Sequence, residues 1–226
     1  MKIFIPMAGK GTRLRPFTLT CPKPLINVLD KPIVEHLIDQ ITSKVKSNID
    51  EIVYILGDES YFNAEVVNSL NIISEKYNAK TKIYRQLEQL GTGHAIMCAE
   101  ESLSGPSIIA YADTMIQGNI EIDTQVDGIM WVKKVDNPSA YGVVNLDNEN
   151  KITELIEKPA EFISDLAVVG IYYFKEAANL RGYLRKHLSE KLSPGKEYLL
   201  NYGIEKMIKN GDSFVPKEID VWMDCG

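Results

Sequence analysis

The first half of the chain alternates short apolar runs with longer stretches in which apolar residues recur at helical spacing. Four runs are too short for a helical repeat and predict buried strands, at residues 2–7, 51–56, 81–85 and 107–111. Two stretches between them predict helices, at residues 33–45 and 61–77, and residues 90–102 predict a glycine-opened loop followed by a helix. Strands that alternate with helices are typical of βαβ units. We therefore expect an α/β fold with a mostly parallel central sheet and helices on both faces.

The second half has a different pattern. Closely spaced strand-like runs predict a smaller antiparallel region with at least one hairpin, at residues 129–135, 142–146, 152–157 and 168–174. Two helices and two late strands are expected after it, at residues 177–188, 199–208, 213–216 and 221–223. No linker rich in Pro, Gly or Ser interrupts the chain, so we expect a single domain over residues 1–226.

Composition narrows the possible classes of function. The 226 residues are 45% hydrophobic and 25% charged, as in a soluble globular protein, and the net charge of -6 argues against a general nucleic-acid binder. No apolar stretch approaches the roughly 18 residues of a membrane span, and no signal peptide is evident, so we expect a cytoplasmic protein. Three distant cysteines indicate neither a disulfide framework nor a zinc site.

The most informative stretch follows the first predicted strand, where residues 8–13 read AGKGTR. Gly9 and Gly11 let the backbone turn sharply and bring N–H groups close to an anion. The glycines alone leave a plain tight turn open, because they match neither the dinucleotide fingerprint nor a Walker loop. Arg13 and Lys23 add two cations suited to phosphate oxygens, so the stretch predicts a polyphosphate-binding loop.

Three segments follow the carboxyl ends of predicted strands: the glycine-rich loop, residues 86–93 and Asp113. Ligands of open parallel sheets sit beyond these ends, so we expect the three segments to share one cleft. The amide of Gln86 both donates and accepts hydrogen bonds and suits the edge of a pyrimidine, with Gly91 and Thr92 beside it. The alternative for this run is a surface loop with a capping threonine.

Asp113 and Asp224 are candidate ligands of a divalent cation. A magnesium–triphosphate site takes only one or two carboxylates, because Mg²⁺ keeps several waters. A lone aspartate at a strand end is otherwise a helix cap or turn former. Asp224 lies in the run WMDCG, where Trp222 would anchor a strand end and Gly226 would turn the chain. No nucleophile with a partner histidine is evident, which favours direct displacement over a covalent intermediate.

Candidate contacts for a second substrate lie in the antiparallel region. Glu157 could accept hydrogen bonds from hydroxyls and Lys158 could bind a phosphate, although Glu-Lys-Pro is by itself a common solvated loop. The candidate set is Tyr141, Gly142, Glu157, Lys158 and Gly170. Residues 195–198, with the sequence GKEY, are interpreted as a helix start and not as part of a site.

The ordered motifs resemble those of the nucleotidylyltransferases that activate sugar 1-phosphates. They are GKGTRL from residue 9, PKP from 22, QLEQLGTG from 86, Asp113, YG from 141, EKP from 157, VG from 169 and WMDCG from 222. The resemblance implies a single Rossmann-like domain of the nucleotide-diphospho-sugar transferase type, with a nucleotide-binding half (1–115) and an acceptor-binding half (116–226). It also implies a Mg²⁺-dependent reaction, in which a phosphorylated acceptor attacks the α-phosphorus of a nucleoside triphosphate in line and releases pyrophosphate.

The same resemblance implies a role for each candidate residue. The nucleotide would be bound by Ala8, Gly9, Gly11, Thr12, Arg13, Gln86, Gly91 and Thr92. Arg13, Lys23 and Asp113 would be catalytic, and Asp113 and Asp224 would hold Mg²⁺. The acceptor would be bound by Tyr141, Gly142, Glu157, Lys158 and Gly170. A homodimer is a family-level expectation, and no hexapeptide-repeat region is expected within these residues.

The base and the acceptor stay open. The pattern also resembles the cytidylyltransferase branch, whose acceptors include phosphocholine and, in capsule phosphoramidate synthesis, glutamine phosphate. We therefore expect CTP and glutamine phosphate, in capsule biosynthesis, with a sugar 1-phosphate and UTP, dTTP or GTP as the alternative. Ala112, Thr114 and residues 199–201 depart from the pattern of the sugar enzymes on the acceptor side.

Two readings from other classes are weaker. A nucleotide-binding regulatory subunit that has lost catalysis should have lost Lys23, Asp113 or Asp224, and all three are present. A metal-dependent glycosyltransferase on a related fold would want a second carboxylate two residues after Asp113, where Met115 stands.

Overall fold

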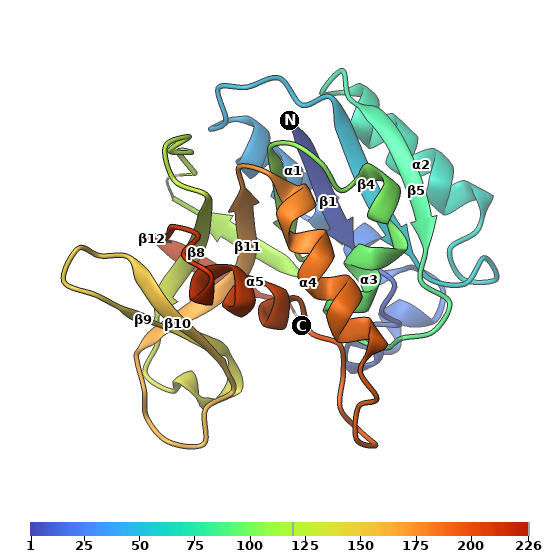
Figure 1. The fold of residues 1–226 in the computed structure, drawn as a ribbon. Coiled ribbons are helices and arrows are strands. Elements are labelled where there is room, and N and C mark those ends of the chain that lie inside the picture. The colour runs from blue at the N-terminus through green and yellow to red at the C-terminus, as the bar shows by residue number, and fades with distance from the viewer. Residues whose placement is uncertain (119, 226) are drawn as a thin grey trace.

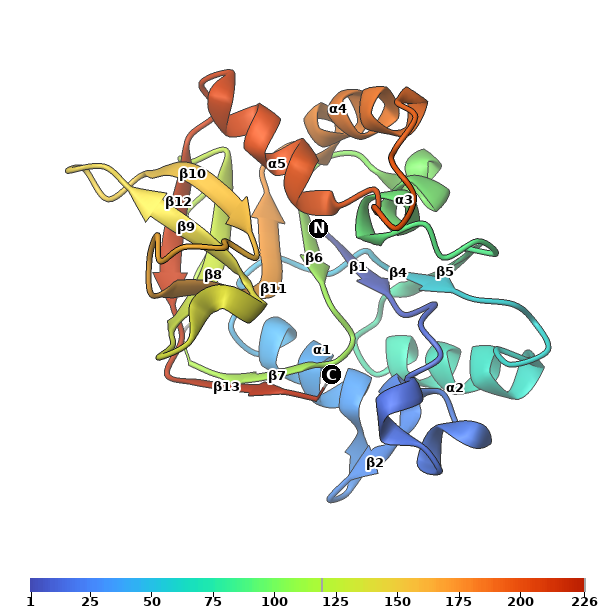
Figure 2. The ribbon, with the colours of Figure 1, turned by 90° about the horizontal axis from the view of Figure 1, so that it is seen from below.

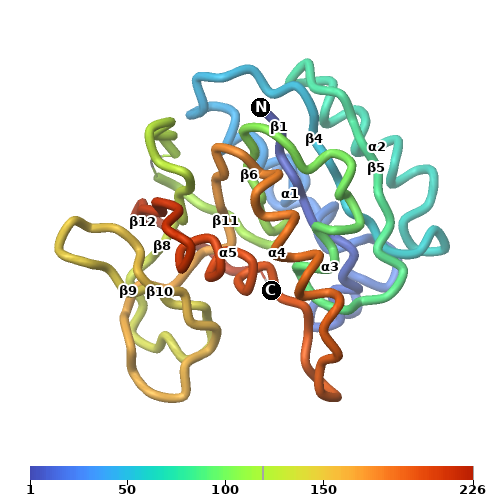
Figure 3. The backbone as a smooth tube through the Cα atoms, viewed as in Figure 1, coloured from blue at the N-terminus to red at the C-terminus, as the bar shows by residue number. Residues whose placement is uncertain are grey.

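A mixed sheet is the frame of the computed structural model, which describes residues 1–118 and 120–225 (Figure 1). Among these residues the sheet has nine strands, in the order β10-β9-β11-β6-β1-β4-β5, with β8 beside β11 and β12 beyond β8. Strand β5 and the β9–β10 hairpin form two of its edges and lie on opposite sides of the molecule (Figure 3). Gly226, expected to turn the chain, lies outside the described residues.

The parallel part of the sheet contains the four strands expected in the first half. They are β1 (Lys2–Pro6), β4 (Glu51–Leu56), β5 (Lys80–Arg85) and β6 (Ser107–Ala110). Strand β11 (Leu166–Phe174) runs antiparallel to β6 and carries the rest of the sheet. The remaining strands are β8 (Gly128–Lys134), β9 (Gly142–Leu146), β10 (Ile152–Glu157) and β12 (Phe214–Glu218). The α/β fold with an antiparallel region in the second half is confirmed.

Helices cover both faces of the sheet, as expected (Figure 2). Helices α1 (Ile33–Thr42) and α2 (Ala64–Glu75) lie on one face, and α3 (Thr92–Cys98), α4 (Ala177–Ser189) and α5 (Leu200–Lys209) on the other. Alternation along β1 supplies both cores: Ile3 and Ile5 pack with α1 and α2, while Phe4 packs on the side of α3 and α5. None of the helices in the described part of the chain is long and apolar enough to cross a membrane.

Two features differ from the expectations: the start of α2 and one additional strand. Helix α2 begins at Ala64 and not at residue 61, because the Asn63 side chain accepts hydrogen bonds from the backbone N–H groups of Glu65 and Val66. Strand β7 (Thr114–Gln117) was not predicted; it pairs with β13 (Val221–Asp224). Short apolar segments such as β7 carry a strand only when a distant partner supplies the hydrogen bonds.

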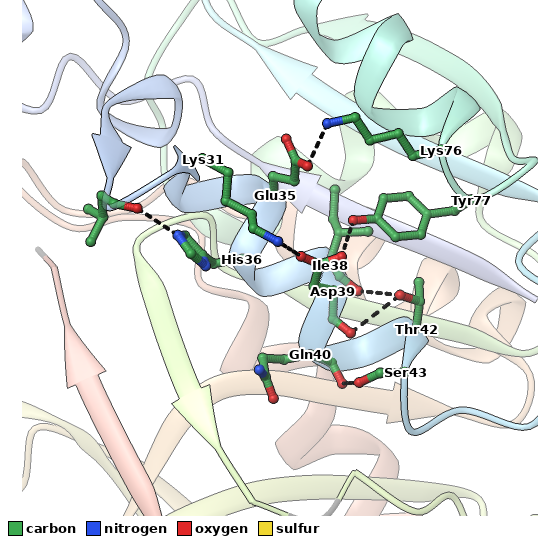
Figure 4. A network of polar contacts seen from close by, with 11 residues as sticks. Lys31, Glu35, His36, Ile38, Asp39, Gln40, Thr42, Ser43, Lys76 and Tyr77 are labelled. Carbon is green, nitrogen blue, oxygen red and sulfur yellow. Dashed lines mark hydrogen bonds and ion pairs between the residues drawn. The ribbon is translucent and has the colours of Figure 1, made fainter.

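Helix α1 is tied to its surroundings by a polar network (Figure 4). The carboxylate of Asp39 accepts hydrogen bonds from Lys31, which precedes the helix, and from the hydroxyl of Tyr77, which follows α2. Glu35 is buried and pairs with Lys76 at 2.6 Å. The ring of His36 is hydrogen-bonded to the carbonyl of Val28 in the hairpin formed by β2 (Asn27–Val28) and β3 (Lys31–Pro32). The network fixes α1 against the hairpin that follows the glycine-rich segment.

Replacing Asp39 with asparagine should destabilise the protein near neutral pH. Burial pushes the pKa of Asp39 up, but hydrogen bonds from Lys31 and Tyr77 outweigh it and hold the pKa below its usual range. Such a carboxylate stabilises the fold above its unfolded-state pKa of about 4, and this stabilisation is lost as the pH falls through the folded-state pKa. Urea unfolding should show a deficit of about 1 kcal/mol at neutral pH that shrinks below about pH 4. A deficit that stays constant with pH would contradict this assignment.

Candidate active site

The four parallel strands end at one edge of the sheet, and the segments that follow them meet there. The register pairs Pro6 with Ile55, Leu56 with Arg85 and Phe4 with Ile109, so β1, β4, β5 and β6 end almost level. The next residues continue the pairing: the N–H of Met7 donates to Ile55, and that of Gln86 to Leu56. The expected convergence of the glycine-rich loop, residues 86–93 and the segment after β6 is therefore present.

The glycine-rich loop is folded back on itself by local contacts. Gly11 adopts φ 59°, and a Cβ there would lie 2.9 Å from the Cβ of Lys23 and 3.0 Å from Thr18. The buried Thr18 hydroxyl donates to the carbonyl of Gly11 at 2.8 Å. Tyr61, in the segment after β4, donates through its hydroxyl to the carbonyls of Thr18 and Cys21. The turn at Gly11, which leads to Arg13, is thus packed directly against Lys23.

Lys23 and Asp113 form an ion pair, with 2.7 Å between Nζ and Oδ2. Asp113 lies in the turn between β6 and β7. Strand β13 pairs with β7 so that Asp224 lies opposite Thr114, and the N–H of Cys225 donates to the carbonyl of Asp113. The unpredicted β7–β13 pairing is therefore what brings together two aspartates that are far apart in the sequence.

Two adjoining cavities contain all of the predicted site residues. The first, of 470 Å³, is lined by Gly11, Thr12, Arg13, Lys23, Thr92, Asp113, Tyr141, Gly142, Glu157, Lys158, Gly170 and Asp224. The second, of 340 Å³, is lined by Ala8, Gly9, Gly11, Lys23, Gln86, Gly91, Thr92 and Asp113. The wall common to both is formed by Gly11, Lys23, Thr92, Tyr111, Asp113 and Glu197. After the roles that the resemblance implies for their lining residues, which stay predictions, we call the 470 Å³ space the acceptor cavity and the 340 Å³ space the nucleotide cavity.

The side-chain amide of Gln86 holds the loop of residues 86–93 in shape. Nε2 of Gln86, which is buried, lies 3.0 Å from the carbonyl of Gly91 and 3.0 Å from Nδ1 of His94. Burial lowers the pKa of His94, which favours a neutral ring whose Nδ1 accepts this hydrogen bond. The amide nitrogen of Gln86 is thus engaged within the loop, and its contact with a base stays a prediction.

The far wall of the acceptor cavity joins β10, β11 and α5. Nδ2 of Asn201 donates to Oε2 of Glu157 at 2.7 Å, and the hydroxyl of Tyr172 donates to Oδ1 of Asn201 at 3.1 Å. The rings of Tyr141 and Trp222 meet edge to face with centroids 4.8 Å apart, which anchors β13 beside β9. The role expected for Trp222 in holding this strand agrees with that contact.

Residues 4–226 match the family model described as nucleotidyl transferase. The chain belongs to this family.

Curated relatives cover the whole chain. The bifunctional protein GlmU of Methanococcus maripaludis is 33% identical over 230 residues, which are 100% of this chain and 51% of the relative. The UTP–glucose-1-phosphate uridylyltransferase AglF of Haloferax volcanii is 30% identical over 236 residues, which are 100% of this chain and 91% of AglF. The chain spans about half the length of the GlmU relatives that it matches.

Solved structures show the same fold. A putative glucose-1-phosphate thymidylyltransferase from Bacillus anthracis superposes with a TM-score of 0.81 at 24% identity, over 99% of this chain and 89% of that one. A UDP-glucose pyrophosphorylase complexed with UDP-glucose gives a TM-score of 0.78 at 22% identity, over 99% of this chain and 92% of that one.

In this member of the nucleotidyl transferase family, Glu197 and Asn201 line the cavities although neither was among the predicted site residues. The interpretation of residues 195–198 as a helix start was wrong, because the segment is not helical and α5 begins at Leu200. Backbone hydrogen bonds from Tyr198 to Leu90 and from Gly93 to Tyr198 hold the segment against the loop after β5. This pairing between segments distant in the sequence overrides the local pattern that predicted a helix start. In the sequence, only the polar residues beside Leu199 and Leu200 indicated a site here.

The donor set fits a hard divalent cation. Asp113 and Asp224 supply carboxylate oxygens from neighbouring segments of the acceptor cavity, and Mg²⁺ binds through one or two carboxylates while the substrate and water complete its shell. No cluster of three or more His, Cys, Asp or Glu side chains suited to a metal occurs within residues 1–118 and 120–225.

Replacing Gly91 with alanine should destabilise the fold more than the same change at Gly195. Both glycines have positive φ, 117° and 81°, but only Gly91 is crowded, since a Cβ there would lie 2.6 Å from the carbonyl oxygen of Tyr198. Gly195 has nothing within 4 Å of that point. Thermal or urea unfolding should place the Gly91 variant lower by about 1–3 kcal/mol. Equal losses in the two variants would mean that the contact with Tyr198 does not constrain the loop.

Proposed function

We propose that this protein transfers a nucleotidyl group from a nucleoside triphosphate to a sugar 1-phosphate, giving a nucleotide sugar and pyrophosphate. The observation that carries the proposal is the Lys23–Asp113 pair in the wall between two cavities. A transfer between two bound substrates needs such a point, where the attacking oxygen and the α-phosphorus can be held in line. Family membership and the complete set of motifs support the same reaction class.

Each cavity would hold one substrate. In the nucleotide cavity, the backbone N–H groups of Ala8, Gly9 and Gly11 would wrap the triphosphate. Arg13, which lines the adjoining acceptor cavity, would neutralise its charge from that side. In the acceptor cavity, Glu157 would accept hydrogen bonds from hydroxyls and Lys158 would contact the acceptor phosphate. Because both substrates are anionic, these cations would also offset the repulsion between them as they approach.

Lys23 would stabilise the charge that develops during the transfer. Its ammonium lies at the junction of the cavities, within reach of phosphate oxygens from either side. In this chemistry the protein mainly positions the substrates and stabilises charge, which is what a fixed cation and oriented amides provide. Asp113 and Asp224 would hold a divalent cation, which supplies further neutralisation of phosphate charge when bound.

A sugar 1-phosphate is favoured over glutamine phosphate. The relatives are named as GlmU proteins and as a UTP–glucose-1-phosphate uridylyltransferase, and the fold neighbours are named for UDP-glucose or glucose 1-phosphate. The expectation of CTP, glutamine phosphate and capsule biosynthesis has no support among them. We therefore favour UTP or dTTP with a hexose 1-phosphate, and keep CTP with glutamine phosphate or phosphocholine as arms of the assay.

Pyrophosphate release tests the proposed activity directly. The wild-type protein, with Mg²⁺, should release pyrophosphate in a grid of nucleoside triphosphates against hexose 1-phosphates, phosphocholine and glutamine phosphate only where a sugar 1-phosphate is present. Release with CTP and glutamine phosphate would restore the cytidylyltransferase reading. Silence across the grid, with triphosphate binding retained, would favour a regulatory subunit. Consumption of a nucleotide sugar without pyrophosphate release would favour a glycosyltransferase.

Lys23→Ala and Asp113→Ala should each lower kcat by roughly 10²–10³-fold, or about 2.7–4 kcal/mol, as for other groups that stabilise developing charge. Lys31→Ala is the matched control, since it removes another lysine from a Lys–Asp pair that lies outside both cavities. We expect near-normal turnover from the control. Near-normal turnover from folded Lys23 or Asp113 variants would refute the assigned roles.

Asp224→Asn should raise the Mg²⁺ concentration required for half-maximal rate by roughly tenfold, because one anionic ligand becomes a neutral amide. Rates measured across a magnesium titration give this value, and Asp220→Asn, on the loop before β13, serves as control. A lower maximal rate with an unchanged magnesium dependence would place Asp224 in another role.

A further inference from the structure

Asn201, in the first turn of α5, joins two strands of the acceptor cavity. Its Oδ1 accepts a hydrogen bond from the hydroxyl of Tyr172 on β11 at 3.1 Å, and its Nδ2 donates to Oε2 of Glu157 on β10 at 2.7 Å. Gly142 of β9 closes the third side, since a Cβ there would lie 3.0 Å from Nδ2 and 3.1 Å from Oε2. Three strands and a helix therefore surround one amide.

The carboxylate of Glu157 determines which end of the amide faces it, and Tyr172 is the partner of the other end. The tyrosine is 2% exposed, and burial raises the pKa of its hydroxyl well above the ordinary value. The hydroxyl therefore stays protonated and can donate to Oδ1 of Asn201, which lies 3.1 Å away. A carboxylate only accepts hydrogen bonds, so the end of the amide that faces Glu157 is the donating Nδ2.

We propose that Asn201 is a positioning residue that determines how Glu157 meets the acceptor. By holding Oε2, the amide leaves Oε1 to accept a hydrogen bond from a hydroxyl of the sugar phosphate. This rests on the proposed function, in which Glu157 receives such a hydroxyl. The other groups that face this carboxylate are Lys158, whose Nζ lies 3.9 Å from Oε1, and the hydroxyls of Tyr111 and Tyr172 across the cavity wall.

Asn201→Asp is the informative substitution. It replaces the donor with a second carboxylate at a distance where two carboxylates cannot both ionise cheaply, so the pair would share a proton at low pH and repel at high pH. An aspartate is favourable in the first turn of a helix, so the fold should be retained. The ratio of acceptor KM in the variant to that in the wild type should rise from about threefold near pH 6 to more than tenfold near pH 8.5. The nucleotide KM should change by less than about twofold.

Two further variants isolate the cause. Asn201→Ala removes the donor without adding charge, so its acceptor KM should rise by a factor that does not depend on pH. Asn145→Asp is a matched control, because Nδ2 of Asn145 donates to Oε2 of Glu154 at 3.0 Å in the same hairpin but outside both cavities. It creates the same kind of carboxylate pair and should leave both KM values unchanged.

A carbon-13 NMR titration of glutamate carboxyl groups tests the contact without any substrate. The Glu157 signal is assigned by its loss in Glu157→Gln, and its midpoint should lie at higher pH in Asn201→Asp than in Asn201→Ala. No difference between these midpoints would overturn the contact. A shifted midpoint with a flat KM ratio, or equal effects on nucleotide and acceptor, would overturn the positioning role. Failure of the wild-type protein to release pyrophosphate would instead contradict the proposed function.

Discussion

The ion pair between Lys23 and Asp113 is the contact on which the site depends. The two residues are 90 positions apart in the sequence, and each reaches the pair through a different constraint. Lys23 is packed against the turn at Gly11, whereas Asp113 is held in the turn that follows β6. If either constraint failed, the two cavities would lose the charged wall that they share. The sheet, the glycine-rich loop and strand β13 therefore act together to hold these two opposite charges at a fixed place.

The central sheet could be predicted from the sequence because the patterns that determine its strands are local. Buried strands such as β1 and β4 carry apolar side chains on both faces, so a short stretch of sequence is enough to recognise them. The rule that ligands bind beyond the carboxyl ends of parallel strands then placed Asp113 and residues 86–93 in one cleft. Resemblance to a family added the residues of the antiparallel region, whose individual motifs are too short to be specific.

What the sequence did not reveal depends on contacts between distant segments. Strand β7 exists because β13 pairs with it, and Glu197 reaches the cavities because residues 195–198 pair with the loop after β5. Asn201 follows two leucines at the start of a helix, where the local sequence predicts an ordinary solvent-exposed asparagine. Its importance comes from Tyr172 and Glu157, which belong to strands that local patterns could not pair with that helix.

The acceptor side of the site contains a strained backbone position. Lys158 adopts φ 45° although it is not a glycine, a conformation that costs roughly 1–2 kcal/mol, and its N–H donates to the carbonyl of Tyr141 at 3.0 Å. Nearby Gly170, at φ 84°, brings the backbone of β11 against the ring of Tyr111. Such strain persists only where the surrounding structure over-determines it. Here the surroundings include β10, which carries Glu157, and β11, which carries Gly170, so the rigidity of this wall and the orientation of the carboxylate have one physical origin.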